Sequence, residues 1–361
     1  MEKQKFTKMA LLFLSFSSLI AISRGIVSNR IGINYGHLGN NLPSPARSIE
    51  LLGNMSVGRV KLYDADHDIL NLLSGKDIEV AITVANDEIS GIAANQHLAD
   101  QWVYEHVLAH YPSTRIRFLL VGHEVFSSIS TPADLQIARD LVPAIRRIKS
   151  TIKAQGIRNI KIGTPLAMDM METTFPPSNG SFKPEVREFM GPLLRYLNGT
   201  KSFFFVDVYP YITWFESQVW NQTAINLDFA LLRSGNESYT DPKTGLVYTN
   251  LLDQMLDSVV YAMAKLGYND VMLAIGETGW PHEGESGANR ENAAEYNNNL
   301  VRKMSAVPTI GTPARPGEVI PTFIFSMYDE NQKYGPATER HWGLLNPDGS
   351  PVYEVNITSG V

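Results

Sequence analysis

The segment IRFLLVGHEV, residues 116–125, decides the fold class because its apolar residues run without the polar alternation of a half-exposed strand. A continuous apolar run of this length fits a strand that is covered on both faces, as in a parallel sheet. Two ionisable residues, His123 and Glu124, stand side by side near its end. Such residues are rarely buried unless they have a function or sit at the solvent end of the strand. We therefore predict that this strand end carries chemistry.

Seven further runs of this kind are spread along the chain, and amphipathic helical patterns lie between them. The predicted strands cover residues 30–36, 57–66, 78–84, 116–125, 160–166, 203–211, 271–280 and 321–330. Apolar residues spaced three and four apart predict helices over residues 98–111, 133–156, 249–267 and 289–305. Thr131 and Pro132 should begin the second of these helices, and Gly156 should end it.

This alternation predicts an α/β fold, a (β/α)8 TIM barrel with elongated loops at the C-terminal face of the strands. The 361 residues of the chain exceed the ~250 that are typical of this barrel, and the extra length is expected in two loops, 167–183 and 212–248. No linker or internal repeat interrupts residues 25–361, so a single domain is predicted. The alternative, an open doubly wound sheet, favours a Gly-rich turn after the first strand, which INYGHLGNN at residues 33–41 matches only loosely.

The N-terminal segment has the features of a secretory signal. Three lysines precede an apolar run over residues 9–22, and small residues follow it. This pattern predicts that residues 1–24 are a signal peptide cut near Ser23 or Gly25, with a signal anchor as the alternative, although the run is short for a membrane span. The sequence also contains six N-x-[ST] acceptor sites for glycosylation, at Asn54, Asn179, Asn198, Asn221, Asn236 and Asn356. We therefore predict a secreted protein of the extracellular space or cell wall.

Composition excludes several classes of function. The net charge of -6 and the absence of a basic stripe argue against binding to nucleic acid or anionic lipid. The chain has no cysteine, which excludes disulfides, zinc-thiolate sites and thiol nucleophiles. The C-terminal stretch VYEVNITSGV offers no hydrophobic tail for a lipid anchor. We predict a monomer with no cofactor, no metal and no stable membrane insertion.

Two glutamates fall where such a barrel would place its active site, at the C-terminal ends of the strands. Glu124 ends the fourth predicted strand and Glu277 ends the seventh, on facing sides of the barrel mouth. Hydrolysis of a glycosidic bond needs one carboxyl group to protonate the leaving oxygen and a second to attack or stabilise the anomeric carbon. Flat faces for sugar rings are offered by Tyr35, Phe175, Tyr209, Tyr211 and Trp280. The alternative to a catalytic role is that a glutamate at a strand end is simply solvated or salt-bridged. Two glutamates on facing strands make the catalytic role the favoured one.

Six motifs then carry a resemblance to a known family. They are IGINYG, VGHEVF, VYPY, GETGWP, ENAAEYNNNL and MYDENQKYGPATERHWGLLNPDGSPVYEV. In this order they resemble plant glycoside hydrolase family 17, the β-1,3-glucanases, from about residue 30 to residue 355. The resemblance implies a retaining barrel enzyme that cleaves internal β-1,3-glucosidic bonds in callose-like or laminarin-like β-glucan.

The resemblance also implies roles for individual residues. Glu124 stands in the place of the acid/base, and Glu277 stands in the place of the nucleophile. The auxiliary charged positions are Glu330, Lys333 and Glu339, and the positions expected to bind substrate are Tyr35, His123, Phe175, Asp207, Tyr209 and Trp280. A cation lowers the pKa of a nearby carboxyl group, so we expect Lys333 to keep Glu277 ionised. Ionised Glu277 should in turn raise the pKa of Glu124, which must start protonated.

Three polar positions near this site depart from the family pattern. His123 and Asp207 each stand where the family usually has Asn, and Lys61 stands where Arg is common. Two alternatives to β-1,3-glucan hydrolysis therefore stay open: a catalytically weak β-glucan-binding cell-wall protein, and a hydrolase of mixed-linkage β-1,3;1,4-glucan.

His123 raises a geometric question, because adjacent residues on a strand point to opposite faces. Strict strand geometry would place His123 in the barrel wall, whereas the resemblance implies that the backbone bends and lets His123 and Glu124 both reach the cleft. An imidazolium beside Glu124 would lower the pKa of that acid. We predict that His123 contacts substrate and weakens the work of Glu124 without abolishing it.

Overall fold

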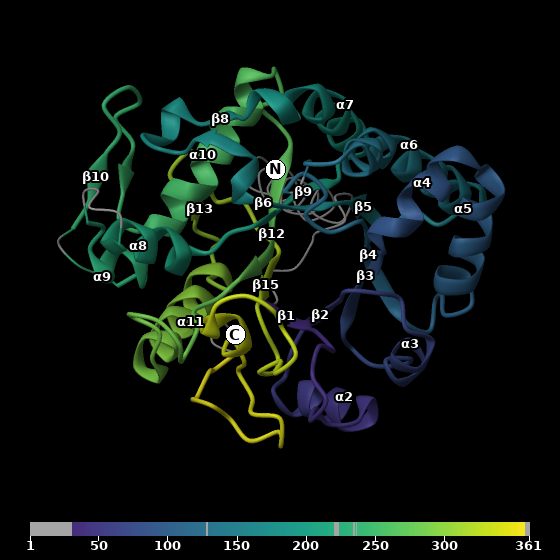
Figure 1. Cartoon of the computed structure of the whole chain (residues 1–361), viewed down its shortest axis with the longest axis horizontal. Coiled ribbons are helices and arrows are strands. Elements are labelled where there is room, and N and C mark those ends of the chain that lie inside the picture. Colours follow the sequence, from purple (N-terminus) through teal and green to yellow (C-terminus); the bar gives the residue numbers. More distant parts are fainter. Residues whose placement is uncertain (1–30, 128, 220–223, 234, 236, 358–361) are drawn as a thin grey trace, which may run out of the picture.

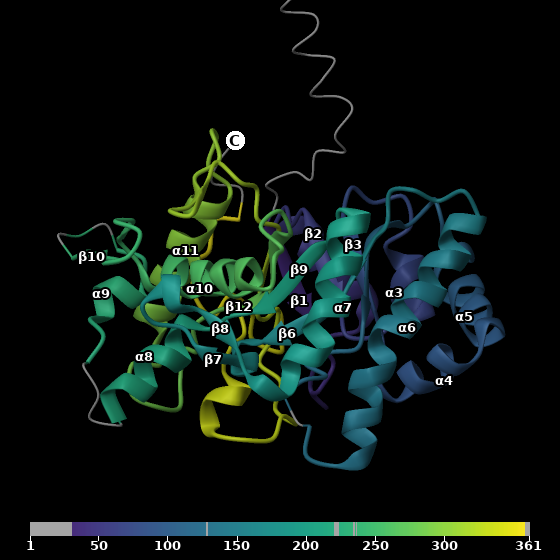
Figure 2. The same cartoon turned by 90° about the horizontal axis from the view of Figure 1, so that it is seen from above.

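The fold is built around a barrel of parallel strands. The structure is a computed structural model and describes residues 31–357, apart from 128, 220–223, 234 and 236. Its main sheet has nine strand segments with helices outside it (Figure 1, Figure 2). The segments are β1 Ile31–Tyr35, β2 Arg59–Leu62, β3 Glu79–Val84, β4 Arg115–Val121, β5 Lys161–Gly163, β6 Pro165–Ala167, β9 Phe203–Asp207, β12 Met272–Thr278 and β15 Thr322–Ile324. All neighbouring pairs run parallel, and the prediction of a TIM barrel is confirmed.

One interrupted strand closes the barrel. The order of neighbours is β5-β4-β3-β2-β1-β15-β12-β9-β6, so β5 and β6 stand at its two ends although only Thr164 separates them in the chain. β5 pairs with β4, and β6 pairs with β9. The predicted strand over residues 160–166 therefore occupies one strand position of the barrel, but its first half pairs with β4 and its second half pairs with β9.

Helices follow the strands as predicted, except after the last one. The α-helices are α2 Pro45–Asn54, α3 His67–Leu72, α4 Ile89–Ala94, α5 Gln96–Val103, α6 Pro132–Ala154, α7 Pro184–Thr200, α8 Pro210–Val219, α9 Leu227–Ala230, α10 Leu251–Lys265 and α11 Arg290–Met304. The shorter helical turns are η1 Asn86–Glu88, η2 Tyr104–Leu108, η3 Met168–Met170, η4 Pro177–Asn179 and η5 Ala337–Arg340. Beyond β15 the described chain forms η5 but no α-helix.

Helix α6 shows why the sequence marks its ends so clearly. The Thr131 side chain accepts a hydrogen bond from the Asp134 backbone N–H, and the Asp134 carboxylate accepts one from the Thr131 N–H. This reciprocal capping box satisfies donors that a helix start leaves unpaired. Pro132 fits the first turn, where no N–H is needed, and Gly156 follows the helix with a φ of +73°. Both predicted ends are confirmed.

Two apolar cores hold the barrel together. The inner one fills the barrel with Ala81, Phe118, Leu120, Phe203, Phe205, Ala274 and Phe323. The Phe118 ring lies edge-on to the Phe203, Phe205 and Phe323 rings, at centroid distances of 6.1, 5.6 and 6.1 Å. The larger core lies between the strands and the helices. Because the strands bury both faces, their sequences lack alternation, as the opening segment indicates.

The two predicted long loops become structured insertions beside the barrel. Residues 167–183 contain η3, η4 and a hairpin of β7 Met171–Thr173 with β8 Ser181–Phe182. Residues 212–248 contain most of α8, then α9 and a hairpin of β10 Tyr239–Thr240 with β11 Val247–Tyr248. Figures 1 and 2 show α8, α9 and β10 at one end of the molecule, next to the barrel. A further small hairpin joins β13 Gly311–Thr312 to β14 Arg315–Pro316.

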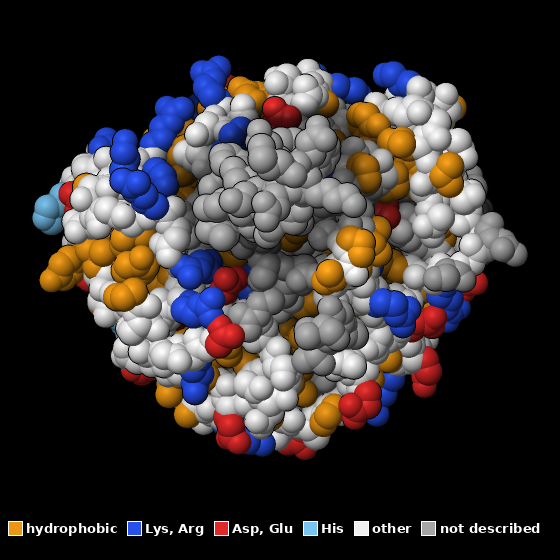
Figure 3. All heavy atoms as spheres, turned by 180° about the vertical axis from the view of Figure 1, so that it is seen from behind, with side chains coloured by type: hydrophobic (Ala, Val, Ile, Leu, Met, Phe, Trp, Pro, Cys, Tyr) orange, Lys and Arg blue, Asp and Glu red, His pale blue; other side chains and the backbone are white. Residues whose placement is uncertain are grey.

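Some sequence predictions fall outside the described residues. These are the signal peptide over residues 1–24 and the acceptor sites Asn221 and Asn236. Asn54, Asn179 and Asn356 are exposed, and Asn198 is half-buried in α7. Within residues 31–357, leaving out the positions not described, no helix is long and apolar enough to cross a membrane. Figure 3 shows acidic and basic side chains together on one face.

Candidate active site

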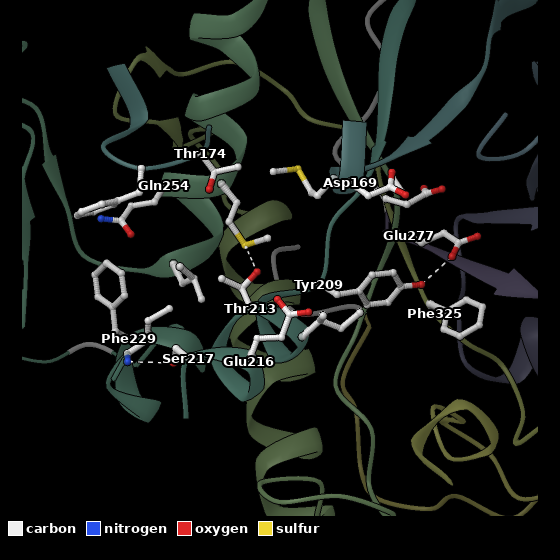
Figure 4. Close-up of a pocket in the computed structure, with 18 of the residues that line it drawn as sticks. Asp169, Thr174, Tyr209, Thr213, Glu216, Ser217, Phe229, Gln254, Glu277 and Phe325 are labelled. Carbon is white, nitrogen blue, oxygen red and sulfur yellow. Dashed lines mark hydrogen bonds between the residues drawn. The ribbon is translucent and has the colours of Figure 1, made fainter. Parts of the chain in front are cut away.

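A cleft of about 1290 Å³ lies at the C-terminal ends of the strands, where the barrel meets the two insertions. Both candidate catalytic glutamates line it, and so do His123, Asp207 and Tyr209. The rest of its wall comes largely from the two insertions, including Thr174, Thr213, Glu216 and Phe229, and from α10, which supplies Gln254 (Figure 4). The cleft thus extends from the barrel mouth over the inserted segments, as a site for an elongated ligand would.

Glu277 is positioned by an irregularity in β12. The register of β12 shifts after Ile275 against both neighbouring strands. Such a bulge re-aims a side chain at the end of a strand. The Glu277 side chain is 6% exposed and reaches the barrel mouth.

Four donors hold the Glu277 carboxylate. Its Oε1 accepts hydrogen bonds from Lys61 Nζ at 2.7 Å, Tyr63 OH at 2.6 Å and His123 Nε2 at 2.8 Å. Its Oε2 accepts one from Tyr209 OH at 2.6 Å, the contact drawn in Figure 4. Lys61 and Tyr63 come from β2 and its end, and Tyr209 follows β9. Donors from several strands therefore converge on one carboxylate.

The charges around Glu277 fix its protonation state. Burial by itself raises the pKa of Glu277, but Lys61 and His123 outweigh burial through charge and hydrogen bonding and hold this pKa well below its usual range. Burial and the Glu277 charge raise the pKa values of the Tyr63 and Tyr209 hydroxyls, which therefore stay protonated and donate. These surroundings favour the ionised form of the Glu277 carboxyl group.

Glu124 lies in the opposite kind of environment. Among the described residues, none donates a hydrogen bond to its carboxyl group. Burial raises the pKa of Glu124, and the nearby Glu277 charge adds to this effect, while His123 opposes it; the net shift is upward. One glutamate is thus kept charged and the other is disposed to carry a proton, which is the division of roles that an acid and a nucleophile require.

The backbone at the end of β4 brings both His123 and Glu124 into the cleft. The strand ends at Val121, and Gly122 and Glu124 have positive φ values of 71° and 49°. The Asn86 side chain then clamps the turn, because its Oδ1 accepts from the His123 N–H at 2.8 Å and its Nδ2 donates to the His123 carbonyl at 3.0 Å. His123 is therefore not in the barrel wall, and the backbone departure implied by the resemblance is present.

The auxiliary charged residues are placed differently from one another. Glu330 is buried and accepts a hydrogen bond from the Leu38 N–H at 2.7 Å, which ties the loop after β1 to the end of the barrel. Lys333 lines the cleft, 3.8 Å from Glu330 Oε2 and 3.9 Å from the centre of the Phe325 ring. Glu339 also lines the cleft. The expectation that Lys333 keeps Glu277 ionised is wrong, because the lysine on Glu277 is Lys61.

The predicted sugar-binding aromatics divide into two groups. Tyr209 and Phe175 line the cleft, and Phe175 is 57% exposed beside Tyr239. Trp280 is fully buried, and its indole N–H donates to the Gly287 carbonyl. Tyr35 is also buried, edge-on to Tyr328 and outside the cleft lining. Trp280 and Tyr35 are therefore core residues here, not residues of the cleft wall.

Sequence reasoning places Lys61 near the site but misses its contact with Glu277, and it misses Tyr63, Phe325 and Trp342 altogether. Lys61 and Tyr63 contact Glu277 directly, and the Phe325 and Trp342 rings line the cleft next to Tyr209. The signal for the first two was available, since both lie on the second predicted strand near its C-terminal end. Trp342 could not be found this way, because it lies outside every predicted strand.

A histidine–aspartate cluster joins the loops that follow β12 and β15. Asp329 accepts from His282 Nε2 at 2.9 Å and from the Gly343 N–H at 2.9 Å, and His341 Nδ1 lies 3.4 Å away. The ligand atoms of the three side chains lie within 4.8 Å of one another, so they could hold a metal ion. Their mutual hydrogen bonds already account for the arrangement as a clamp between two rim loops.

Comparison with known proteins agrees with this geometry. A probable glucan endo-1,3-beta-glucosidase A6 of Arabidopsis thaliana is 54% identical over 336 residues, which are 92% of this chain and 68% of that relative. Glucan endo-1,3-beta-glucosidase 12 of the same plant is 35% identical over 97% of this chain and 64% of its own length. The chain thus spans about two thirds of these curated relatives.

Solved structures match over nearly their whole length. A β-1,3-glucanase and allergen of Cryptomeria japonica pollen superposes with a TM-score of 0.83 at 38% identity, covering 91% of this chain and 99% of that one. One of two plant β-glucan endohydrolases with distinct substrate specificities gives a TM-score of 0.81 at 32% identity, covering 90% and 99%. The model of the glycosyl hydrolases family 17 matches residues 31–357. The barrel, the paired glutamates and these matches together place the chain in glycosyl hydrolase family 17.

Proposed function

We propose that this protein hydrolyses internal β-1,3-glucosidic bonds of β-glucan with retention of configuration, with Glu124 as acid/base and Glu277 as nucleophile. The observation that carries the proposal is the contrast between the two carboxyl groups in one cleft. Glu277 accepts four hydrogen bonds and has a lowered pKa, whereas Glu124 has a raised pKa. The names of the relatives supply the substrate class.

The chemistry follows from the hydrogen bonds. In the first step the Glu124 proton goes to the leaving glycosidic oxygen as a Glu277 oxygen bonds to the anomeric carbon. Oε1 of Glu277 already accepts three hydrogen bonds and Oε2 accepts one, so Oε2 keeps a lone pair for the attack. In the second step ionised Glu124 takes a proton from water as the water oxygen bonds to the anomeric carbon, and the bond from that carbon to Glu277 breaks and releases the sugar.

The cleft also supports binding of a polymer. Tyr209 and the exposed Phe175 offer faces for sugar rings on the insertion side of the barrel mouth. Polar side chains such as Thr213 and Gln254 alternate with the apolar lining (Figure 4). Few precisely placed polar groups on an apolar wall are typical of small-molecule and sugar sites.

The test compares the wild-type protein with Glu277→Gln on laminarin, callose and mixed-linkage β-1,3;1,4-glucan, by release of reducing ends. The substitution removes the nucleophile but keeps its size, so we expect turnover to fall by several orders of magnitude with the fold intact. Glu283→Gln, an exposed acid six residues further on, serves as the matched control and should retain full activity. Glu277→Gln activity within tenfold of wild type would contradict the covalent mechanism.

Two further measurements address the stereochemistry. A retaining pair should hold its carboxyl groups roughly 5–5.5 Å apart, as against ~6.5–9.5 Å for inversion. The first product seen by NMR should be the β-anomer. An α-anomeric first product would show that Glu277 is not the nucleophile.

His123 and Asp207 favour one alternative, a β-glucan-binding wall protein with weak catalysis. Both line the cleft beside Glu277 and depart from the family pattern. Binding of laminarin without release of reducing ends would support that alternative. Preferential cleavage of mixed-linkage glucan would support the other alternative, a hydrolase of mixed-linkage β-1,3;1,4-glucan.

We also propose that the protein is secreted to the extracellular space or cell wall and acts as a monomer. The support is the N-terminal signal pattern and the exposed acceptor sites Asn54, Asn179 and Asn356. Expression in a plant secretory host should give a mature N-terminus near residue 25 and a mass shift on enzymatic deglycosylation. An uncleaved N-terminus would indicate a signal anchor instead. The monomeric state is tested by light scattering, which should give the mass of one chain.

A further inference from the structure

The least explained group in the cleft is the carboxyl group of Asp207. It ends β9 directly beside Glu277 in the sheet register, and its side chain is 0% exposed. Among the described residues neither of its oxygens has a hydrogen-bond partner. Room for it exists because residue 276 is glycine; a Cβ there would collide with Asp207 Oδ1. A buried acid without hydrogen bonds is costly, so its presence calls for a compensating role.

His123 is the cationic group nearest to this acid in the ion pairs of the site. Its Nε2 lies 3.5 Å from Asp207 Oδ2 and 2.8 Å from Glu277 Oε1. This nitrogen can carry one proton, and Glu277, at the shorter distance and with a lowered pKa, is the acceptor that the geometry favours. Asp207 thus flanks the imidazole at the point where the imidazole contacts the nucleophile.

The surrounding charges favour a shared proton in this pair. Burial, followed by the Glu277 charge, raises the pKa of Asp207 to about 8. Burial lowers the pKa of His123, but the charge and hydrogen bond of Glu277, together with the Asp207 charge, outweigh burial, so the net shift of this pKa is upward. The other titratable groups that face the pair are Lys61 from β2 and Glu124 beside His123, while the Tyr63 and Tyr209 hydroxyls remain protonated. Interacting groups of this kind release their protons as a pair and not one by one.

We propose that Asp207 is a positioning residue that acts through His123, the buried carboxyl group and the partly exposed imidazole forming an acid–base pair that holds the imidazole N–H on the nucleophile Glu277. The inference deepens the proposed function and rests on it. It also explains why two unusual residues occur together. Removing one member of a buried pair leaves the other without its partner, which costs far more than removing both.

The first test is a double-mutant cycle on laminarin with His123→Asn, Asp207→Asn and the double variant. We expect the kcat of His123→Asn to fall about ten- to a hundredfold and that of Asp207→Asn to fall about tenfold, with little change in KM. The double variant should lose no more than His123→Asn alone. A double variant whose loss equals the product of the two single losses would overturn the pairing. If His123→Asn fails to fold, His123→Gln replaces it, and melting temperatures check every variant.

The second test does not depend on activity. The His123 imidazole resonance is one of eight in the chain and is identified by its loss in His123→Asn. Its titration should move to lower pH in Asp207→Asn, because an amide cannot carry the negative charge that raises the pKa of His123. Asp257→Asn is the matched control, since Asp257 is also a fully buried acid with a raised pKa but lies on α10, away from the pair; it should leave the titration unchanged.

The two tests separate the inference from the proposed function. An unchanged His123 titration in Asp207→Asn would overturn the pairing even in an active enzyme. A wild-type protein that cleaves none of the three glucans would contradict the proposed function, while the titration would still decide whether the pair exists.

Discussion

Glu124 and Glu277 are the same residue type in one cleft, yet their surroundings give them opposite protonation states. Four donors, two of them cationic, contact Glu277, whereas burial dominates at Glu124. The sequence identifies both glutamates from their strand ends. It does not identify which lysine charges Glu277, because that depends on how β2 and β12 face each other across the closed barrel. Lys333 is nearer than Lys61 to Glu277 along the sequence, but Lys61 is the lysine that contacts Glu277 in space.

Replacing Lys61 by Met should move the acid limb of the kcat/KM profile to higher pH. Lys61 lowers the pKa of Glu277, so without it Glu277 takes up a proton at a higher pH and loses its proposed role as nucleophile there. Lys333→Met is the matched control, since Lys333 lines the same cleft but pairs with Glu330. The measurement is a pH–rate profile of each variant on one soluble β-1,3-glucan. If Lys333→Met shifts the acid limb and Lys61→Met does not, then Lys333, and not Lys61, is the lysine that keeps Glu277 ionised.

The structure changes what we expect from His123→Asn. The sequence predicts that His123 weakens the work of Glu124, because the imidazolium opposes protonation of that acid, and on this ground alone removal of His123 would be beneficial. That opposing effect is present, but His123 also donates to Glu277 and flanks the buried Asp207. Losing both contacts outweighs the relief at Glu124, so the single substitution should be harmful. The sequence could not show this, since residues 123, 207 and 277 belong to three different strands.

At the scale of an element, the end of β4 is the feature that makes the site possible. A regular strand would turn one of His123 and Glu124 away from the cleft. Positive φ values at Gly122 and Glu124 break that alternation, and the Asn86 side chain fixes the result. The strand itself is predictable from its apolar run. Its irregular end is not, because it depends on a side chain from the end of the neighbouring strand.

Gly122→Ala should therefore damage both stability and catalysis. An alanine at a φ of +71° is strained, and its Cβ would lie 2.7 Å from Val125 Cγ1 and 2.9 Å from Asn86 Oδ1. We expect a loss of about 2–4 kcal/mol in the free energy of unfolding, from left-handed strain plus overpacking. The turnover number should fall at least tenfold, since Asn86 would be pushed off the His123 backbone.

Gly156→Ala provides the matched control for this experiment. Gly156 has nearly the same φ, +73°, but no atom lies within 4 Å of the position of its Cβ. Only the strain of about 1–2 kcal/mol should remain, with unchanged turnover. Urea unfolding and steady-state kinetics of both variants give the comparison. Equal losses of stability at the two glycines would show that the crowding at the β4 end has no energetic consequence.

At the scale of the whole molecule, the eight barrel staves and four of the helices are predictable from apolar runs and cap residues. Two other features are not. The first is the division of the strand over residues 160–166 into β5 and β6 at Thr164. The second is the folding of the insertions into hairpins that line the cleft. Pairing partners and insertion packing are contacts between distant parts of the chain, and a local pattern carries little information about them. The same limit explains why Trp280 was predicted at the sugar site, since an aromatic residue after a strand can serve either the cleft or the core.

Trp280 and Phe175 allow a direct comparison, because Trp280 lies in the core and Phe175 lies in the cleft wall. Trp280 is fully buried against Tyr211, Trp214 and Tyr296, so Trp280→Ala should lower the free energy of unfolding by about 3–5 kcal/mol. Phe175 is 57% exposed in the cleft wall, so Phe175→Ala should change that free energy by less than about 0.5 kcal/mol. It should instead raise KM for a soluble β-1,3-glucan about fivefold, as expected for one lost ring contact. Urea unfolding and KM measured on both variants, with Trp280→Phe as a milder core substitution, separate the two roles. A higher KM with unchanged stability in Trp280→Phe would place the tryptophan at the sugar after all, and would mean that the cleft reaches deeper between β12 and α11 than its lining residues indicate.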